Sequence, residues 1–186
     1  MSEYVPSGAV LAWRSPSEEA GVATDLQAEY AAFYVAQFRA VARTVYLVLY
    51  DREHAEDVTQ DAFVQLYVHW PKVARYDAPY AWVRRVAIRM AVRAARRERQ
   101  RLELSRLSPD ALAPADAPLD IDLLRAAAAL PARQRAAVAL HYYEDRPVVE
   151  VADLLGCSVS ATKVMLHRAR QALAARLADE ELDDVH

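Results

Sequence analysis

Beyond residue 21 the chain contains a single glycine, Gly156, and the whole chain of 186 residues contains only three glycines. Glycine supplies the positive φ angles of the tight turns that hairpin-rich β architectures need. No alternation of apolar and polar residues, the pattern of a half-buried strand, runs for more than a few positions. Long stretches of good helix formers favour helices instead. The sequence therefore predicts an all-α fold.

Prolines and a capping residue divide the first part of the chain into helices. Residues 26–50 contain neither glycine nor proline. Asp51 is a good N-cap for a helix from about residue 53 to Trp70, which Pro71 is expected to end. Pro79 suits the first turn of a long helix that reaches about residue 102.

Three prolines interrupt residues 105–120, which predicts an extended, flexible connection. A second helical unit follows, punctuated by Pro131 and Pro147. The predicted organisation is a flexible N-terminal extension at 1–25, a small helical domain at 26–103, a flexible linker at 104–120, a second small helical domain at 121–177 and an acidic tail at 178–186.

The net charge of −3 conceals two basic blocks. Residues 72–106 carry eleven Lys and Arg against three Asp and Glu, and residues 132–176 carry seven against four. A concentrated basic block favours a polyanionic partner. One cysteine excludes a disulfide framework, and polar residues interrupt the most apolar stretch, 30–50. The N-terminus also lacks the pattern of a secretory leader. We therefore expect a soluble, cytoplasmic protein with no membrane insertion.

The long helix predicted after Pro79 has a core-facing stripe and a basic stripe. The core-facing stripe has ordinary amphipathic spacing: Val83, Val86, Ala87, Met90 and Ala94. The basic stripe, called the arginine stripe below, repeats at i,i+4: Arg85, Arg89, Arg93 and Arg97. Like charges at that spacing destabilise a helix by about 0.2–0.5 kcal/mol per pair. A polyanion along the stripe would turn this repulsion into attraction, so the stripe indicates a nucleic-acid contact. The alternative is a solvated face.

Aromatic residues lie beside the arginine stripe in the sequence, at Tyr76, Tyr80 and Trp82. Aromatic rings next to arginines suit stacking on unpaired bases. The alternative is packing in the core, which for Trp82 is as favourable as base contact.

The helix predicted over 53–70 also has two stripes. Its core face holds Ala55, Val58, Ala62, Phe63, Leu66 and Trp70. A separate stripe, called the docking stripe below, holds Asp57, Gln60, Asp61, Val64 and Val68. A mixture of carboxylates, an amide and valines predicts protein docking, and the main alternative is a helix buried on two sides. Asp57 and Asp61 would also suit acid–base chemistry, but no nucleophile or metal-ligand set accompanies them.

Residues 148–173 have the pattern of a helix-turn-helix. Gly156 fits the left-handed residue that ends the first helix, and Ser158 can cap the second. The inward positions of the second helix are Thr162, Leu166, Ala169 and Leu173, and the outward positions are Ser160, Lys163, Val164, His167, Arg168 and Gln171. A polar, basic outer face after a glycine turn is typical of DNA-binding motifs, although other helical hairpins have a similar pattern.

Three segments resemble a bacterial RNA polymerase sigma factor of the extracytoplasmic-function (ECF) group of the sigma-70 family. The segment AEDVTQDAFVQLY at 55–67 resembles the region 2 helix that docks on the polymerase clamp. The segment PYAWVRRVAIRMAVRAARR at 79–97 resembles the next helix, which works on the −10 promoter element. Residues 130–173 resemble region 4, whose helix-turn-helix reads the −35 element.

The resemblance implies a sigma factor that binds core RNA polymerase, recognises the −35 and −10 elements and directs transcription initiation. It implies no enzymatic activity, catalytic residue, cofactor or metal. The implied partners are the clamp helices of the largest polymerase subunit, the polymerase flap, double- and single-stranded promoter DNA, and an anti-sigma factor. The implied location is the cytoplasm, in association with the nucleoid.

The resemblance assigns residues to three sets. The polymerase-core set is the docking stripe: Asp57, Gln60, Asp61, Val64 and Val68. The −10 set is Lys72, Arg75, Tyr76, Tyr80, Trp82, Arg85, Arg89, Arg93 and Arg97. The −35 set is Ser158, Ser160, Lys163, Val164, His167 and Arg168.

The chain departs from the family pattern at several positions, of which four bear on DNA contact. Arg89 stands where the family usually has Asn, and Arg93 stands where it usually has an acid, so both departures strengthen the arginine stripe. Ala161 and Met165 stand where the family usually has a Thr and an Arg that touch DNA.

Two other function classes fit parts of the sequence. A dimeric helix-turn-helix repressor with an N-terminal ligand domain would need a self-association helix and a ligand pocket. A helical enzyme would need a catalytic constellation, which the sequence does not provide.

Overall fold

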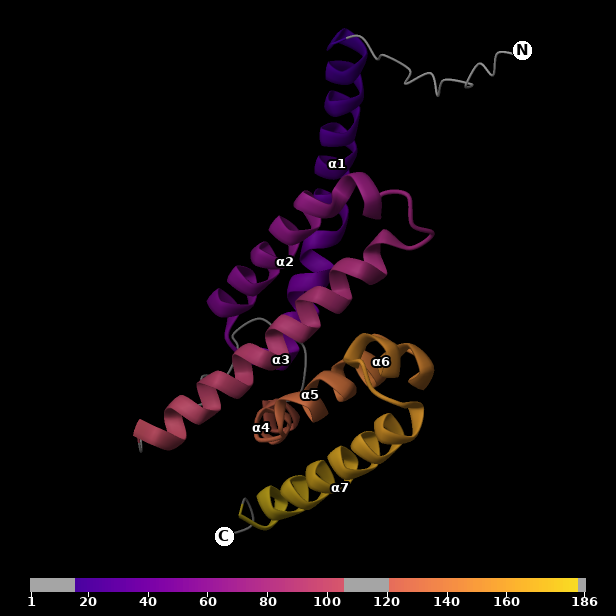
Figure 1. The fold of residues 1–186 in the computed structure, drawn as a ribbon. Coiled ribbons are helices and arrows are strands. Elements are labelled where there is room, and N and C mark those ends of the chain that lie inside the picture. The colour runs from indigo at the N-terminus through magenta and orange to yellow at the C-terminus, as the bar shows by residue number, and fades with distance from the viewer. Residues whose placement is uncertain (1–15, 106–120, 184–186) are drawn as a thin grey trace, which may run out of the picture.

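The computed structural model describes residues 16–105 and 121–183, which contain helices and no strand. The all-α fold class is thereby confirmed. The elements are α1 Pro16–Leu49, α2 Arg52–Val73, α3 Pro79–Ser105, α4 Ile121–Ala128, α5 Ala132–Val138, the π-helix η1 Ala139–Tyr143, α6 Val148–Leu155 and α7 Val159–Asp183 (Figure 1). Parts of the predicted extension, linker and acidic tail (1–15, 106–120 and 184–186) lie outside the described residues.

Several helix ends lie where the sequence predicts them. The carboxylate of Asp51 accepts a hydrogen bond from the backbone N–H of His54 at 2.9 Å, and so caps α2. Helix α3 begins at Pro79, and α5 and α6 begin directly after Pro131 and Pro147. These signals are reliable because each acts on backbone groups within one turn of itself.

Two boundaries differ from the sequence expectation. Helix α1 begins at Pro16 rather than at residue 26, because proline at the first helical position sacrifices no hydrogen bond and one interior glycine costs only about 1 kcal/mol. Helix α2 continues through Pro71 to Val73. The N–H of Ala74 still bonds the carbonyl oxygen of Trp70 at 2.9 Å, and Val73 is buried, so the last turn persists despite the proline.

Helices α1, α2 and α3 pack on one another around an apolar core. Aromatic rings join α1 to α2: the ring centroids of Phe33 and Trp70, and those of Tyr34 and Phe63, are each 5.0 Å apart. The hydroxyl of Tyr30 donates to the carbonyl oxygen of Phe63 at 2.8 Å. The predicted core stripe of α3 faces this core, with Val83, Ala87 and Ala94 buried and Val86 and Met90 half-buried. This packing fixes the outer faces of α2 and α3.

Helices α6 and α7 form the predicted helix-turn-helix. Gly156 ends α6 in the left-handed conformation, with φ 63° and ψ 48°. The hydroxyl oxygen of Ser158 accepts the N–H of Ala161 at 3.1 Å and caps α7. Of the predicted inward positions, Thr162, Leu166 and Ala169 are buried and Leu173 is half-buried.

The chain between α5 and α6 contains a widened turn that the sequence does not predict. In η1 the N–H of Glu144 bonds the carbonyl oxygen of Ala139 at 3.1 Å, five residues back instead of four. Asp145 then adopts a positive φ of 52°. The N–H of Arg146 bonds the carbonyl oxygen of Leu140 at 3.0 Å, which closes the turn. This turn projects Glu144 from the end of η1.

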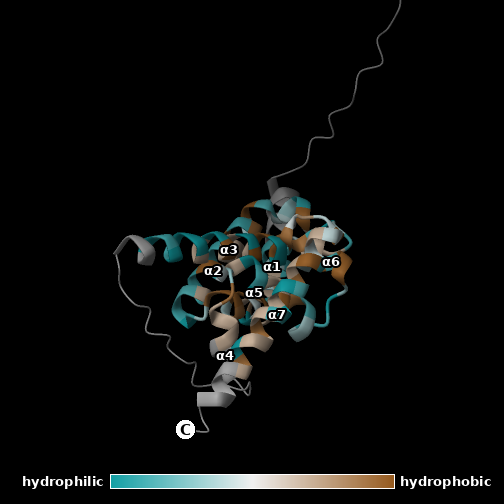
Figure 2. Ribbon diagram, turned by 90° about the horizontal axis from the view of Figure 1, so that it is seen from below, coloured by the Kyte–Doolittle hydropathy of each residue, from teal (hydrophilic) through white to brown (hydrophobic). Residues whose placement is uncertain are grey.

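The helices fall into two groups, α1–α3 and α4–α7, and these two helical groups share one continuous core. Helix α5 packs on α1 and α3, and α6 packs on α3. Buried residues of both groups belong to the same cluster, including Val41 and Val45 of α1, Ile88 and Ala91 of α3, and Ala137, Leu140 and Leu155 of the second group. Helix α3 is therefore covered on two sides, and in Figure 2 its C-terminal part, which extends beyond this packing, is hydrophilic.

A second contact between the groups joins the end of α1 to α5. The guanidinium carbon of Arg135 lies 5.6 Å from the ring centroid of Tyr50, and Arg135 also donates to the carbonyl oxygen of Ala128 at 2.9 Å. Burial raises the pKa of Tyr50 to about 12, and the positive charge of Arg135 opposes part of that rise.

Replacing Gly156 with valine is expected to destabilise the protein by about 1–2 kcal/mol, because a β-branched residue resists positive φ. An added Cβ would also lie 2.8 Å from Nη2 of Arg89. Thermal melting of the full chain measures the effect, at about 2–4 °C per kcal/mol. Gly156→Asn is the control, because asparagine tolerates the left-handed conformation. A valine variant that melts with the wild type would contradict the assignment.

The Tyr50 environment predicts a loss of stability at alkaline pH. The unfolded chain releases this phenol proton near pH 10, whereas the folded protein holds it until about pH 12. Stability from this group is therefore complete below about pH 10 and is lost as pH rises toward 12. Tyr50→Phe removes this dependence, so its free energy of unfolding should fall less steeply between pH 9 and pH 11. Identical slopes for variant and wild type would contradict the prediction.

Candidate nucleic-acid interface

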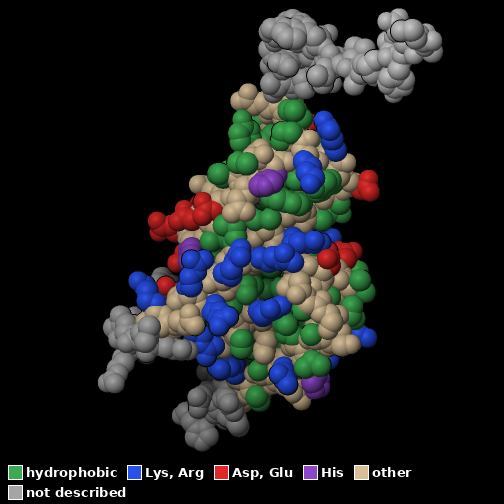
Figure 3. Space-filling view, in the orientation of Figure 1, with side chains coloured by type: hydrophobic (Ala, Val, Ile, Leu, Met, Phe, Trp, Pro, Cys, Tyr) green, Lys and Arg blue, Asp and Glu red, His purple; other side chains and the backbone are tan. Residues whose placement is uncertain are grey.

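Basic side chains gather along α3. Figure 3 shows Lys and Arg side chains in a band across the middle of the molecule, where α3 runs, and continuing over the helices below it. Arg89, Arg93 and Arg97 of the arginine stripe are exposed. Among the described residues, neither Arg89 nor Arg93 forms an ion pair, so their charges are available to an anionic partner.

The first half of the arginine stripe lies against the helix-turn-helix. Arg85 donates to the carboxylate of Asp153 on α6. The guanidinium of Arg89 lies next to the backbone of Gly156, in the turn between α6 and α7. A pocket of about 230 Å³ separates α3 from this turn, lined by Ile88, Arg89, Val92, Arg93, Arg133, Leu155 and Gly156. Sequence reasoning did not foresee that the second group covers part of the stripe.

The aromatic residues beside the stripe divide into two kinds. Tyr76 and Tyr80 are exposed, as are Lys72 and Arg75. Trp82 is half-buried, packs against the core and lies with its ring centroid 5.5 Å from that of His69. Tyr76 and Tyr80 can therefore present a ring to an incoming base, whereas Trp82 presents only part of its surface.

The docking stripe of α2 faces away from the core. All five of its residues are exposed, including Val64 at 62% and Val68 at 70%. Burial on two sides, the main alternative for this helix, is therefore wrong. Tyr67, absent from the predicted set, is also exposed on this helix. The ring centroids of Tyr67 and Tyr30 lie 4.9 Å apart, and this contact restrains the Tyr67 side chain.

The outer face of the helix-turn-helix lies on α7. Ser160, Lys163, Val164, His167, Arg168 and Gln171 are exposed, at the positions that helical spacing predicts. Ser158 is exposed too, but its hydroxyl oxygen already accepts the capping hydrogen bond. The face therefore carries two cations, a hydroxyl, an imidazole, an amide and an apolar side chain.

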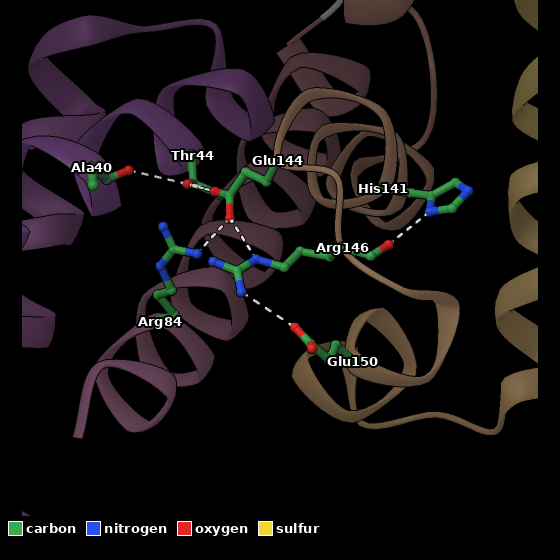
Figure 4. Close-up of polar contacts among 7 residues, drawn as sticks. All are labelled: Ala40, Thr44, Arg84, His141, Glu144, Arg146 and Glu150. Carbon is green, nitrogen blue, oxygen red and sulfur yellow. Dashed lines mark hydrogen bonds and ion pairs between the residues drawn. The ribbon is translucent and has the colours of Figure 1, made fainter. Parts of the chain in front are cut away.

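A polar cluster between the two groups was not foreseen from the sequence. Arg84 donates to Glu144 at 2.6 Å, and both side chains are nearly buried, with 12% and 9% of their surfaces exposed. Thr44 of α1 donates to the other carboxylate oxygen, and Arg146 Nε lies 3.5 Å from the oxygen that Arg84 contacts (Figure 4). Arg84 is thus committed to Glu144 and lies outside the arginine stripe. Arg84 and Glu144 are 60 positions apart in the sequence, so helical periodicity does not predict this contact.

The described residues contain no group of three or more His, Cys, Asp and Glu that could hold a metal ion. None of the helices seen in residues 16–105 and 121–183 is long and apolar enough to cross a membrane.

Comparisons with known proteins agree with this geometry. Residues 33–101 match the family described as Sigma-70 region 2, and residues 120–173 match Sigma-70, region 4. The chain is 24% identical over 151 residues to the ECF RNA polymerase sigma factor SigW of Bacillus subtilis, covering 72% of this chain and 81% of SigW. It is 30% identical over 150 residues to the RNA polymerase sigma-E factor of Streptomyces avermitilis, covering 77% and 82%.

Among solved structures, the chain shares its fold with the sigma factor RpoE from Bartonella quintana, which was crystallised with the anti-sigma factor NepR. The TM-score is 0.67 at 20% sequence identity, over 81% of this chain and 97% of that chain. With regions 2 and 4 matched in order and sigma factors similar over most of their length, the chain belongs to the sigma-70 family, as an extracytoplasmic-function RNA polymerase sigma factor.

Proposed function

We propose that this sigma factor uses three exposed faces to bring core RNA polymerase to a promoter. The observation that carries the proposal is that the three faces lie on three different helices: the docking stripe on α2, the arginine stripe on α3 and the basic outer face on α7. Protein docking, phosphate contact and groove reading can then occur together. The sigma factor supplies promoter choice, and the chemistry of RNA synthesis belongs to the polymerase.

The docking stripe suits the clamp helices of the largest polymerase subunit. Its carboxylates, Asp57 and Asp61, suit basic groups of a partner, and Val64 and Val68 add apolar area that water now covers. An exposed apolar pair framed by polar residues is typical of a protein contact.

The segment from Lys72 to Arg97 suits the −10 element. Tyr76 and Tyr80 are placed to stack on bases of the opened strand, with Trp82 adding its exposed edge. Lys72, Arg75 and the arginine stripe then hold phosphates along the strand.

The N-terminal turns of α7 suit the major groove at the −35 element. Lys163 and Arg168 carry positive charge to the groove, and Ser160, Val164 and His167 supply shorter contacts. Ser158 caps the helix through its hydroxyl oxygen. Its hydroxyl proton is therefore still available for a hydrogen bond to a phosphate. The rest of region 4 is proposed to meet the polymerase flap.

We further propose an anti-sigma factor as regulator and the cytoplasm, at the nucleoid, as the location. The proposed regulator is supported by RpoE of Bartonella quintana, which shares the fold and was solved with an anti-sigma factor. The location follows from the proposed partners, polymerase and promoter DNA.

Transcription assays test the whole proposal. Core polymerase with this chain should produce a specific transcript from promoters selected by binding, whereas core polymerase alone should not. A chain that forms dimers, binds DNA alone and leaves core polymerase unaffected would instead favour the repressor alternative.

Asp57→Ala combined with Gln60→Ala is expected to weaken binding to core polymerase by about tenfold or more, because truncating interface hot spots costs more than about 1–2 kcal/mol. Both residues are exposed, so the helical content and Tm should stay at wild-type values. Glu56→Ala is the matched control, since Glu56 is an exposed acid of the same helix that pairs with Arg52 outside the docking stripe. A titration that shows equal affinity for the double variant and the control would remove the docking role.

Arg89→Gln should separate the role of the arginine stripe from a structural role. Removing a like charge between Arg85 and Arg93 should leave the Tm unchanged or slightly higher. Promoter affinity of the holoenzyme should fall, and its log–log salt slope should decrease by about one if Arg89 neutralises one phosphate. Arg39→Gln, an exposed arginine of α1, controls for net charge. Wild-type affinity with an unchanged slope would exclude the stripe as a DNA track.

A further inference from the structure

We propose that the pocket between α3 and the turn of the helix-turn-helix binds a nucleoside diphosphate or triphosphate. Three arginines hold the phosphates, and an aliphatic wall of the same pocket contacts the nucleoside. The site shares Arg89 and Arg93 with the arginine stripe, but its ligand is a free nucleotide and not the promoter.

Three guanidinium groups from both helical groups meet at this pocket. Arg89 and Arg93 lie about one turn apart on α3, and Arg133 reaches the pocket from α5. All three residues are exposed, and basic side chains are visible both along α3 and on the helices below it (Figure 3). The lining residues that the structure describes include no Asp or Glu. The pocket therefore concentrates positive charge that its own lining does not compensate, which favours an anion between the arginines.

Two contacts keep guanidinium groups at the pocket. Nη2 of Arg133 donates to the carbonyl oxygen of Leu155 at 2.9 Å, which anchors this side chain at the end of α6. The guanidinium of Arg89 lies beside Gly156, where an added Cβ would be only 2.8 Å from Nη2, so the absence of a side chain makes room for it. The bond to Leu155 uses one of the five N–H donors of Arg133. The remaining donors can bind phosphate oxygens in pairs.

The length of the phosphate chain follows from the number of arginines. A single phosphate monoester carries a charge of about −2 at pH 7, which two arginines would balance. A third arginine in the lining therefore suits a longer and more highly charged phosphate chain. Guanidinium groups on neighbouring helices can then bind successive phosphates of one ligand.

The rest of the lining is aliphatic. Ile88 and Leu155 are buried and Val92 is half-buried, and all three face the pocket. An inorganic anion gains nothing from such a wall, whereas a ribose and a base can bury apolar surface on it. The planar arginines can also stack on a base. The volume of about 230 Å³ is below the roughly 300–1,000 Å³ of sites that enclose a drug-sized ligand, so we expect the phosphates inside and the base at the mouth.

Nucleotide and promoter are expected to compete for part of one surface. A nucleotide that occupies Arg89 and Arg93 withdraws two cations from the arginine stripe. Promoter affinity should then fall as the nucleotide concentration rises. This consequence rests on the −10 role proposed above, whereas the site itself does not.

Isothermal titration calorimetry of the full chain, without DNA or polymerase, tests the site. The probes are ADP and GDP, with pyrophosphate and adenosine as the separate halves of such a ligand. Arg93→Gln and Arg133→Gln each remove one cation from the pocket, and Arg133 belongs to none of the residue sets assigned to promoter DNA. Arg176→Gln is the matched control, because Arg176 is an exposed arginine of α7 outside the pocket.

The expected result is saturable binding of one nucleotide per chain, binding of pyrophosphate that is about tenfold weaker, and no binding of adenosine. Each pocket variant should weaken nucleotide binding by about tenfold or more, because it loses hydrogen bonds to a charged group, and Arg176→Gln should match the wild type. If Arg133→Gln lowers the Tm through its lost bond to Leu155, Arg93→Gln decides, since Arg93 has no ion pair to lose among the described residues.

Three outcomes would overturn the proposal. The first is the absence of saturable binding by both nucleotides, and the second is an equal loss of affinity in the pocket variants and in Arg176→Gln. The third is pyrophosphate that binds as tightly as the nucleotides, which would leave the aliphatic wall without a ligand.

The alternative occupant of the pocket is a phosphate of promoter DNA. In that case Arg133→Gln weakens the binding of a single-stranded oligonucleotide while ADP and GDP do not bind, and this result would also overturn the proposal. Nucleotide binding that Arg93→Gln weakens, with oligonucleotide affinity unchanged in the same variant, would support the pocket and reject the −10 role of that arginine.

Discussion

Helix α3 is packed from two sides, and the positions of the other surfaces follow from that constraint. Small residues make the packing possible: Ala87, Ala91, Ala94 and Ala95 are all buried and keep neighbouring backbones close. Two apolar sides leave only a narrow strip of the helix for charge. Arginine suits that strip, because its aliphatic stem can lie along apolar neighbours while the guanidinium stays in water.

Charge balance across the two helical groups reinforces the packing. Helix α3 is rich in arginine, and two of the acids that compensate it, Glu144 and Asp153, come from the second group. The buried pair and the exposed pair contribute differently. Exposed pairs are worth at most about 1 kcal/mol and weaken in salt, whereas a buried pair selects one arrangement by penalising the others. Arg84 and Arg85 of α3 are therefore neutralised by acids of the second group, whereas Arg89 and Arg93 form no ion pair among the described residues.

The sequence predicted those features that depend on a few adjacent residues. Asp51, Gly156 and Ser158 act within one turn of themselves, and the exposed positions of α2 and α7 follow from helical periodicity. Pairings across the chain could not be predicted, because many arginines and acids are available and periodicity does not choose among them. The helix end predicted at Pro71 was wrong for a related reason. The burial of Val73 stabilises one more turn of α2, which the local effect of the proline would otherwise end.

The widened turn of η1 determines the direction in which Glu144 points. Each residue advances a helix by about 100°, so one residue fewer in this turn would rotate the carboxylate away from α3. The length of Ala139–Tyr143 thus sets which helices Glu144 can join, and in this protein these are α1 and α3. Inserting or deleting one residue in this turn would therefore change how the second helical group is held against α3, without altering any residue of the docking stripe, the arginine stripe or the outer face of α7.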